Sequence, residues 1–449
     1  MPYIPVTRAQ RDEMLRTLGI GSMEDLFREV PEEFRFPPIN MEDGLSEAEV
    51  LREISGLAAV NVSAGRYRWF LGGGIYNHFI PAAVNALASR GEFLTAYTPY
   101  QPEVSQGTLQ GIFEYQSMIA RLLGMDVVNA GHYDGATALA EAVIIALKQK
   151  KTGERSRVLI PRNLHPEYKE VLSTYLVSYN PVLEEYPGDP AGAAAGGEAP
   201  ACVVAAYPDF FGVLPDLRGA AGAIHARGGL FIVQADPLML GLFKSPGEWG
   251  ADIVTAEGQC LGNDMNYGGP LLGIMGVTGE LMRKIPGRIA GEARDSRGRR
   301  GYVLTLSARE QHIRRERALS NICSNQGLSM LRSCIYLALM GREGLRRAAE
   351  LCWDRSHYAA KAIGALRGFT AAEEAGGAGG NFFREFTLGL PRGLDAEKLS
   401  GDLIEKKKIV PGLPLSRYFP DRKNQLLVCV TENNSREDID ALVSALGEL

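Results

Sequence analysis

The chain has 449 residues, of which 45% are hydrophobic and 22% are charged, and its formal net charge at pH 7 is −5. That length exceeds one simple core, so we expect about two or three packed units. The composition is ordinary for a soluble globular protein, and the slightly acidic balance gives no electrostatic reason to expect nucleic acid or an anionic membrane as a partner.

The cysteines and the first residues of the chain indicate a reducing compartment. Six cysteines are scattered, with no Cys-x-x-Cys pair and no His/Cys cluster at the spacing of metal ligands, which favours free thiols over a disulfide framework. The opening residues, MPYIPVTRAQRDEM, are too charged for a signal peptide, and the apolar runs stay short of the ~20 residues that a membrane span needs. We therefore expect a cytoplasmic protein.

Residues 1–65 are predicted to form a helical arm. Thr7 with Gln10, and Ser46 with Glu49, have the spacing of capping boxes, in which each pair satisfies two backbone amides at the start of a helix. An arm of this kind more often covers a neighbouring subunit or its own domain than it binds a ligand. The second helix carries an apolar stripe made of Val50, Leu51, Ile54 and Leu57.

Residues 66–330 show an α/β pattern, in which short apolar strands alternate with helices. This alternation predicts a large, mostly parallel sheet with both faces covered. Residues 331–449 are predicted to form a smaller α+β domain, which opens with a long apolar helix over Met330–Met340 and closes with a helix capped by Ser435. The strands expected in the large domain are Val127–Val128, Val158–Pro161, Cys202–Ala206, Leu230–Ala235, Ile253–Ala256 and Leu271–Met275, and its helices follow Ser105, follow Asp134 and cover Leu217–Ala226.

Asp236 directly follows the predicted strand Leu230–Ala235, at the strand end where ligands bind in doubly wound sheets. A carboxylate there can pair with a pyridinium nitrogen and keep it protonated, which makes the ring a better electron sink. The structural alternative is an N-cap for the turn that begins at Pro237. The residues alone leave both interpretations open.

His132–Thr137 precedes the Ala-rich helix, where backbone amides at a helix N-terminus could bind a phosphate. Asp134, however, brings a negative charge to that place and can cap the amides itself. The favoured interpretation is a helix capped by its own aspartate.

Two glycine- and aromatic-rich segments could line a site. Tyr97–Gly107 (YTPYQPEVSQG) is dense in polar and aromatic side chains and is stiffened by two prolines; loops of this kind often line sites, and an interface turn is the equal alternative. Gly72–Gly74, followed by Tyr76, Asn77 and His78, is too loose for a nucleotide fingerprint and is interpreted as a flexible turn near a site.

Two polar segments follow the predicted sheet. Arg294–Arg317 contains eight arginines among acidic residues and includes the start of a helical stretch at Ala308–His312; we interpret it as a solvated, ion-paired face. Ser320–Gln326 is a polar turn that could direct hydrogen-bond donors toward a site. Its Cys323 has no base beside it in the sequence and is expected to be inert.

Residues Ala251–Met275 (ADIVTAEGQCLGNDMNYGGPLLGIM) read as a buried strand, a polar turn, a glycine pair and another apolar strand, yet no lysine occurs between Lys244 and Lys284. The arrangement resembles the one from which pyridoxal-phosphate enzymes of the aspartate-aminotransferase fold present their Schiff-base lysine. The flanking sequence thus indicates a cofactor enzyme, while the missing amine indicates that this chain cannot perform the chemistry alone.

Several long motifs together resemble the glycine decarboxylase family, the P-protein of the glycine cleavage system, and in particular subunit 1 (alpha) of its two-subunit form. The resemblance spans nearly the whole chain and implies an aspartate-aminotransferase-like α/β fold (PLP-dependent fold type I). The motifs are GGGIYNHFIP (72–81), AYTPYQPEVSQGTLQ (96–110), YDGATALAEA (133–142), YPDFFGVLPDL (207–217), AEGQCLGNDMNYGGPLLG (256–273) and GRRGYVLTLSAREQHIRRERALSNICSNQ (298–326).

The resemblance also implies how the cofactor is held. Laid against the lysine-bearing half of the family, Gln259 falls at the Schiff-base position and Asp236 at that of the pyridinium-pairing aspartate, which makes Asp236 a relic of the shared fold. A glutamine amide is not a useful nucleophile toward an aldehyde. Pyridoxal 5′-phosphate is therefore expected to be held covalently by a partner (beta) subunit, in an α2β2 complex that decarboxylates glycine and passes the aminomethyl group to the lipoyl arm of the H-protein.

We expect this chain to supply a second wall of the partner's active site. Two alternatives remain: a non-catalytic scaffold that only stabilises its partner, and a self-sufficient pyridoxal-phosphate enzyme with an unconventional lysine. The wall residues, expected to hydrogen-bond the cofactor phosphate or the substrate carboxylate, are Asn77, Tyr97, Thr98, Tyr100, Gln101, Glu103, Ser320 and Asn321.

Overall fold

The computed structural model describes residues 5–35, 37–38, 40–149, 156–322, 326–377 and 379–449. By its internal contacts the chain divides into two compact units, Met1–Val62 and Ser63–Leu449. In these ranges, every helix is too short or too polar to serve as a bilayer-crossing segment.

The first unit consists of helices and turns. Both predicted capping boxes are confirmed, because the Thr7 hydroxyl accepts the Gln10 amide at 3.3 Å and the Ser46 hydroxyl accepts the Glu49 amide at 3.4 Å. Within the part of the unit that the structure describes, no residue of either α-helix is buried. The elements are α1 (Arg8–Leu18), η1 (Glu24–Phe27), η2 (Glu32–Phe34) and α2 (Glu47–Ala59).

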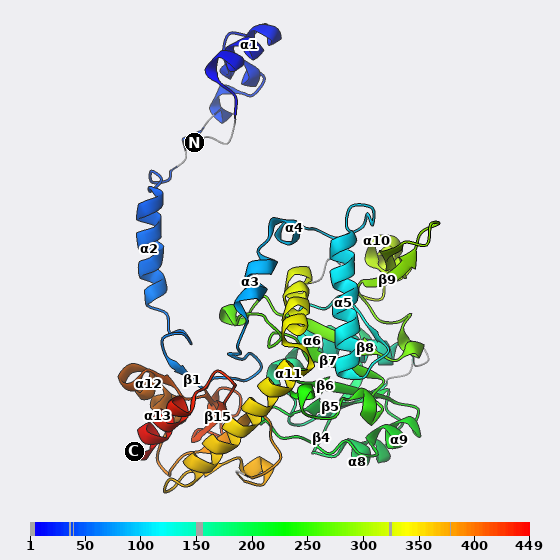
Figure 1. Cartoon of the computed structure of the whole chain (residues 1–449), viewed down its shortest axis with the longest axis vertical. Helices are drawn as coiled ribbons and strands as arrows, with labels where there is room; N and C mark the ends of the chain where they lie inside the picture. The colour runs from blue at the N-terminus through cyan, green and yellow to red at the C-terminus, as the bar shows by residue number, and fades with distance from the viewer. Residues whose placement is uncertain (1–4, 36, 39, 150–155, 323–325, 378) are drawn as a thin grey trace. The chain divides into compact units, whose positions relative to one another are not determined.

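A mixed, mostly parallel sheet is the centre of the second unit (Figure 1). β8 runs antiparallel to β7 and β2, and the other neighbouring strands run parallel to each other, as the sequence predicts. Among the described residues, the spatial order of its seven strands is β2 (Val127–Val128), β8 (Gly273–Val277), β7 (Ile253–Glu257), β6 (Leu230–Ala235), β5 (Cys202–Tyr207), β3 (Arg157–Pro161) and β4 (Val182–Tyr186).

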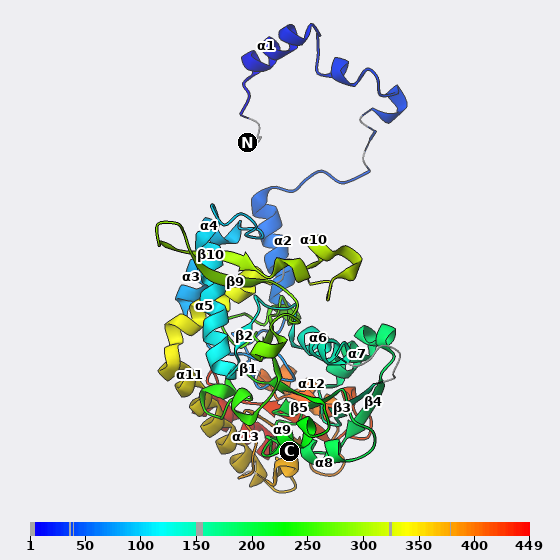
Figure 2. The same ribbon diagram turned by 90° about the vertical axis from the view of Figure 1, so that its right-hand side faces the viewer.

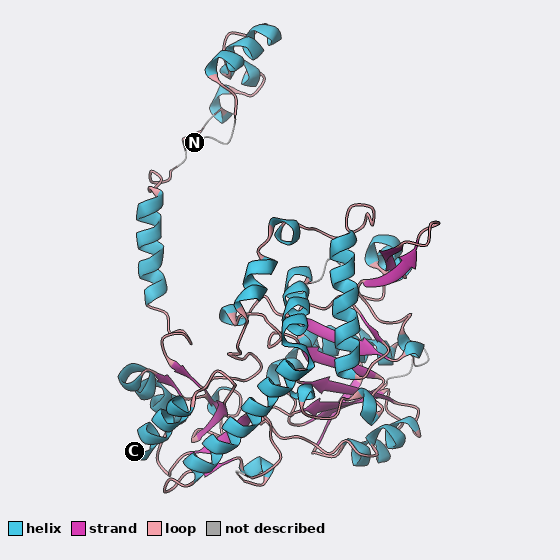
Figure 3. Ribbon diagram, viewed as in Figure 1, coloured by secondary structure: helices cyan, strands magenta, loops and turns pink. Residues whose placement is uncertain are grey.

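Helices cover both faces of this sheet (Figures 2 and 3). Because side chains alternate along a strand, Val203 and Phe231 pack into one core and Val204 and Ile232 into the other. Helix α6 is buried along nearly its whole length, which accounts for its continuous apolar sequence. One face is covered by α6 (Gly135–Leu147) and α7 (Pro166–Tyr175), and the other by α5 (Gln106–Leu123), α8 (Pro190–Ala195), α9 (Ala220–His225) and the first part of α11 (Gly327–Gly364).

A smaller antiparallel sheet lies at the C-terminal end of the second unit. Helix α11 leads into it, is longer than the predicted Met330–Met340 and changes direction at Gly341, whose φ is +58°. The boundary predicted between the large and the small domain, at 330/331, falls inside α11. That boundary stays a prediction. The strands and α-helices of this region are β11 (Thr370–Ala371), β12 (Glu385–Gly389), α12 (Ala396–Lys407), β14 (Leu413–Pro414), β15 (Gln425–Cys429), α13 (Arg436–Gly447), and the parallel pair β1 (Arg68–Trp69) and β13 (Ile409–Val410).

Two local predictions need correction. The arginine-rich segment begins as an antiparallel ribbon, β9 (Ile289–Arg294) with β10 (Arg300–Thr305), which the sequence did not predict. The helical stretch expected at Ala308–His312 is present as three short pieces, η8 (Ser307–Arg309), α10 (Gln311–Arg314) and η9 (Arg315–Arg317). Ser105 precedes α5, but its hydroxyl does not cap that helix. The five cysteines in the described part of the chain are free and buried, as expected, whereas Cys323 lies outside the described residues.

Candidate active-site cavity

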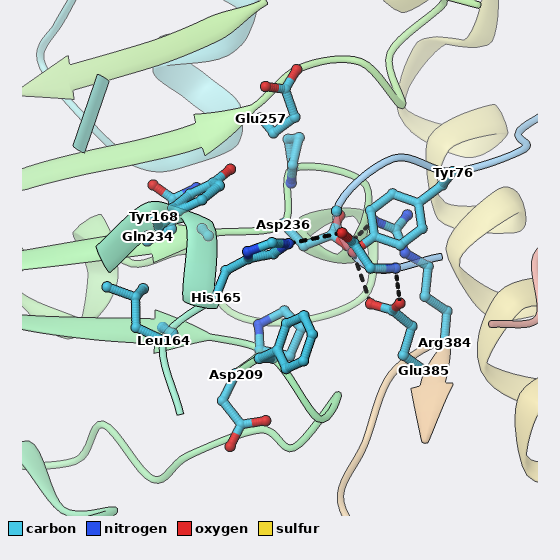
Figure 4. A pocket seen from close by; sticks show the side chains of 17 residues that line it. Tyr76, Leu164, His165, Tyr168, Asp209, Gln234, Asp236, Glu257, Arg384 and Glu385 are labelled. Atoms are coloured by element: carbon cyan, nitrogen blue, oxygen red, sulfur yellow. Dashed lines mark hydrogen bonds and ion pairs between the residues drawn. The ribbon is translucent and has the colours of Figure 1, made fainter. Parts of the chain in front are cut away.

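A cavity of about 80 Å³ lies at the carboxyl ends of β5, β6 and β7 (Figure 4). This is the edge of the sheet at which open α/β folds bind ligands. Gly73 and Gly74 line it, as expected for a turn near a site. The polar side chains around it come from the strands of both sheets and the turns beside them, from the start of α7 and from the segment before α3, and are Tyr76, His165, Tyr168, Asp209, Gln234, Asp236, Glu257, Arg384 and Glu385.

Asp236 lies in this cavity and forms an ion pair with Nη2 of Arg384; both side chains are buried. Its Oδ1 accepts hydrogen bonds from the amides of Leu238, at 3.0 Å, and Met239, at 3.4 Å. Asp236 is therefore both the cap of the following turn and the partner of a cation from its own chain.

Arg384, which directly precedes β12, is the centre of a buried network. Its guanidinium carbon lies 3.5 Å from the centre of the Tyr76 ring, and its Nη1 lies 2.5 Å from His78 Nε2. Since a guanidinium only donates hydrogen bonds, Nε2 accepts, and Nδ1 of His78 donates to Glu432 at 2.7 Å. Burial is the largest single influence and opposes the charge on Arg384, but Asp236 and the other acidic groups around it together raise the arginine's pKa above its ordinary value.

Gln259, at the predicted Schiff-base position, is buried and fully hydrogen-bonded. Its Oε1 accepts the Tyr76 amide at 2.9 Å, and its Nε2 donates to the carbonyls of Tyr76, at 3.0 Å, and Asn263, at 2.8 Å. The side chain thus works as a clamp on the backbone around Tyr76.

Carboxylates also occupy the N-terminus of α6. Asp134 Oδ1 accepts the Thr137 amide at 2.7 Å, which confirms the self-capped helix, and Glu257 Oε2 accepts the Gly135 amide at 2.8 Å. Burial raises the pKa of Glu257 to about 8, although hydrogen bonds from the amides of Gly135, Leu272 and Gln259 oppose that shift. A Cβ added at Gly135 would lie 2.5 Å from the Tyr168 hydroxyl oxygen, so little space remains at this helix end.

The residues of this cavity do not fit pyridoxal phosphate. Among the described lining residues there is no lysine to form a Schiff base, and Asp236 already has Arg384 as its cation. The helix end that would bind a phosphate by its amides carries the two acidic side chains of Asp134 and Glu257 instead.

The predicted wall loop lies at a second cavity, of about 270 Å³, whose lining residues include Tyr97, Thr98 and Arg288. Tyr97 is 77% exposed. The Tyr100 hydroxyl accepts a hydrogen bond from Arg288 at 2.8 Å, and its ring lies edge-on to His312. Beyond it, Gln101 and Glu103 are exposed.

The other predicted wall residues lie elsewhere. The carbonyl of Asn77 accepts a hydrogen bond from Thr431 Oγ1 at 2.7 Å, and Ser320 donates to Glu141 at 2.5 Å; Asn321 is exposed. In the described part of the chain, the predicted wall residues do not line the first cavity, and only Tyr97 and Thr98 line the second. The structure therefore does not bring the whole predicted set together.

Sequence reasoning missed most of the network around Asp236. Far from Asp236 in sequence, Arg384 directly precedes β12, Glu385 is its first residue, and Glu432 lies in the turn after β15. Glu257 could have been noticed, because it follows the apolar strand Ile253–Ala256 at the same sheet edge as Asp236.

The sequence matches the model of the glycine cleavage system P-protein family over residues 1–446. It is 44% identical over 458 residues to a probable glycine dehydrogenase (decarboxylating) subunit 1 of Desulfitobacterium hafniense, covering 100% of both chains. It is 46% identical over 457 residues to the protein so named in Chlorobium phaeobacteroides, again covering 100% of both.

Solved structures agree with these sequence relatives. A glycine decarboxylase (P-protein) of the glycine cleavage system, in inhibitor-bound form, has a TM-score of 0.88 and 44% identity to this chain over 100% of both chains. The sphingosine-1-phosphate lyase of Burkholderia pseudomallei has a TM-score of 0.63 at 14% identity, covering 93% of this chain and 94% of its own. That second likeness concerns the fold alone, which is the aspartate-aminotransferase-like fold predicted from the sequence.

Proposed function

This chain belongs to the glycine cleavage system P-protein family, and on that premise we propose that it is the lysine-free alpha subunit of a two-subunit glycine decarboxylase. With its partner it decarboxylates glycine and passes the aminomethyl group to the lipoyl disulfide of the H-protein. The partner holds the pyridoxal phosphate, which supplies the electron sink for decarboxylation when bound. The observation that carries this division of labour is that the chain's own side chains take the cofactor's places: Asp236 pairs with Arg384 and Glu257 accepts an α6 amide in the cavity, and Gln259 bonds to the backbone of the lining residue Tyr76.

This chain's contribution is a wall for the partner's active site, built chiefly from the Tyr97–Glu103 loop. The loop carries exposed aromatic and polar side chains, and the bond from Arg288 to Tyr100 braces it. A braced loop can present hydroxyl groups at fixed positions without ordering them on binding. Asn77, Ser320 and Asn321 belong to the same proposed wall, although the Ser320 hydroxyl is already bonded to Glu141.

The test combines this chain with the lysine-bearing subunit and measures exchange of the glycine carboxyl carbon with bicarbonate. We expect exchange only in the mixture. Borohydride reduction should place the cofactor on the partner polypeptide, and native mass measurement should give an α2β2 assembly. Covalent cofactor on this chain would overturn the proposal.

A loop variant separates an active-site wall from a pure scaffold. Tyr97→Ala removes a ring that is 77% exposed, so we expect unchanged assembly and stability, since surface substitutions usually cost less than about 0.5 kcal/mol. Exchange should nevertheless fall about a hundredfold, as misplaced positioning groups can cost that much. Tyr179→Ala, at another exposed tyrosine, is the matched control. Full exchange activity in Tyr97→Ala would favour the scaffold.

A further inference from the structure

The segment of residues 73–79, which we call the strap, has no helix or strand of its own. It runs past the first cavity and then leads through Pro81 into α3 (Ala82–Ala88) and α4 (Gly91–Leu94), which end just before the Tyr97–Glu103 loop. An irregular segment must satisfy its backbone polar groups with side chains or water. In the strap those partners are side chains of the cavity and of the smaller sheet.

Gln259 holds the middle of the strap. Its amide group binds both the N–H and the carbonyl of Tyr76, at 2.9 and 3.0 Å. This double contact fixes the backbone of Tyr76 as a neighbouring strand would. The residue that makes it, Gln259, stands at the position where the sequence resemblance places a Schiff-base lysine.

Arg384 and Glu385 hold the strap from the smaller sheet. Glu385 accepts the Gly73 amide at 2.7 Å and the Tyr76 hydroxyl at 2.8 Å. Arg384 stacks on the Tyr76 ring while it pairs with Asp236. One arginine thus joins the end of β6, the strap and the start of β12 (Figure 4).

The far end of the strap is tied by Glu432, in the turn after β15. Its Oε1 accepts the Phe79 amide at 2.8 Å and its Oε2 accepts His78 Nδ1 at 2.7 Å. Cys352 lies beside the same carboxylate, but the guanidinium of Arg384 occupies the other nitrogen of His78, which argues against a metal at this group of ligand-type side chains.

We propose that Arg384, in the cavity, and Gln259, which bonds to the backbone of the lining residue Tyr76, have a positioning role: both hold the strap, and the strap sets the wall loop against the partner's active site. Arg384 stands where a pyridinium would pair with Asp236. The inference rests on the proposed function, because the positioned loop matters only if it faces a partner's active site.

Two kinds of variant test the proposal. Gln259→Met removes the clamp with little change in volume. The double variant Arg384→Met with Asp236→Asn removes the buried ion pair as a unit, so that neither partner of the pair is left as a lone charge, and Asn can still accept at Oδ1. Arg422→Met is the matched control. Arg422 stacks on Phe211, which follows β5 of the large sheet, and pairs with Glu374, near the smaller sheet, but it does not contact the strap.

Hydrogen exchange on the full chain gives the first readout. We expect the peptide over 72–80 to exchange about tenfold faster or more in both test variants, because its amides lose their acceptors or supports. The peptide over α5 should be unchanged, and Arg422→Met should match the wild type over 72–80. Unchanged protection of the strap in both test variants would overturn the proposal.

The second readout is carboxyl exchange by the assembled complex. We expect kcat/KM for glycine to fall about tenfold or more, while assembly and the partner's cofactor absorbance persist. Arg384→Lys keeps a positive charge to pair with Asp236 and should therefore recover part of the rate. The same variant replaces the double variant in the test if the double variant does not fold. A loosened strap with wild-type rates would refute the positioning role, whereas an inactive wild-type complex would refute the proposed function and leave the exchange result standing.

Discussion

Glu257 accepts a hydrogen bond from the backbone amide of Gly135 at 2.8 Å, so a carboxyl group from the end of β7 satisfies the first amide of α6. A helix N-terminus attracts anions through its free amides and its dipole. Here the chain fills that place with its own carboxyl groups, because Glu257 accepts the Gly135 amide and Asp134 accepts the Thr137 amide. The mismatch between this cavity and pyridoxal phosphate therefore extends beyond the absent lysine to the place where a phosphate would bind.

We predict that Gln259→Lys does not restore cofactor binding. The new amine would stand next to Tyr76, beside a cavity in which Asp236 is paired with Arg384 and the α6 amides of Gly135 and Thr137 are already bonded. The ring nitrogen and the phosphate of the cofactor would therefore lack their partners. The variant, incubated with pyridoxal phosphate, should show no band near ~420 nm and no borohydride-stable label at residue 259. The lysine-bearing partner, treated in the same way, is the positive control, and stoichiometric labelling of the variant would contradict the prediction.

Glu257 should make stability depend on pH. Burial raises its pKa from 4.5 to about 8, so between these values the folded chain binds more protons at this group than the unfolded chain does. Its contribution to stability is then present below pH 4.5 and is lost as the pH rises through about 8. The slope for one such group is at most about 1.4 kcal/mol per pH unit.

Urea unfolding at several pH values checks this prediction. In Glu257→Gln the group cannot titrate. The difference in urea midpoint, variant minus wild type, should therefore increase as the pH rises from 5 toward 8. Glu280→Gln changes an exposed carboxyl and should keep the wild-type slope. Parallel curves for wild type and Glu257→Gln would show that Glu257 keeps an ordinary pKa.

What could be predicted from the sequence was local in character. The capping boxes at Thr7 and Ser46, the self-capped α6 and the apolar strands follow from residue spacing alone. Strand β4 was missed because Glu184 and Glu185 break its apolar run, which is tolerated where a strand lies at the edge of a sheet.

The cavity was only half predictable. Asp236 and Gln259 are marked by strands that precede them, whereas Arg384 reaches Asp236 only because the smaller sheet packs beside the larger one. No spacing rule joins residues on two different sheets. The predicted wall residues were chosen because they are polar. Polarity alone cannot distinguish a side chain that bonds within the chain, such as Ser320 with Glu141, from an exposed one, such as Tyr97.

We predict that the apolar stripe of α2 binds the partner subunit. Leu51 is 60% and Leu57 63% exposed, and burying a leucine fully gains about 1.5–3 kcal/mol. Replacing both with Gln, which keeps helix propensity, should weaken association with the partner about a hundredfold and leave the melting temperature of the chain within about 2 °C.

Titration of the labelled chain with its partner measures this effect. Arg52→Gln changes an exposed charged residue of the same helix and should bind as the wild type does. Wild-type affinity in the Leu51/Leu57 variant would mean that the stripe faces another surface.

Gly212 is predicted to be the glycine least tolerant of substitution where the two sheets meet. Its φ is +87°, and an added Cβ would lie 1.9 Å from the carbonyl oxygen of Glu385, next to Arg384. Gly219 has a similar φ of +75° with no atom within 4 Å of the added Cβ, so Gly219→Ala isolates the cost of the backbone conformation, about 1–2 kcal/mol. Gly212→Ala adds a backbone clash and should cost more than about 4 kcal/mol. Urea unfolding of the two variants measures the difference, and equal midpoints would show that the smaller sheet can move away from Gly212 without loss.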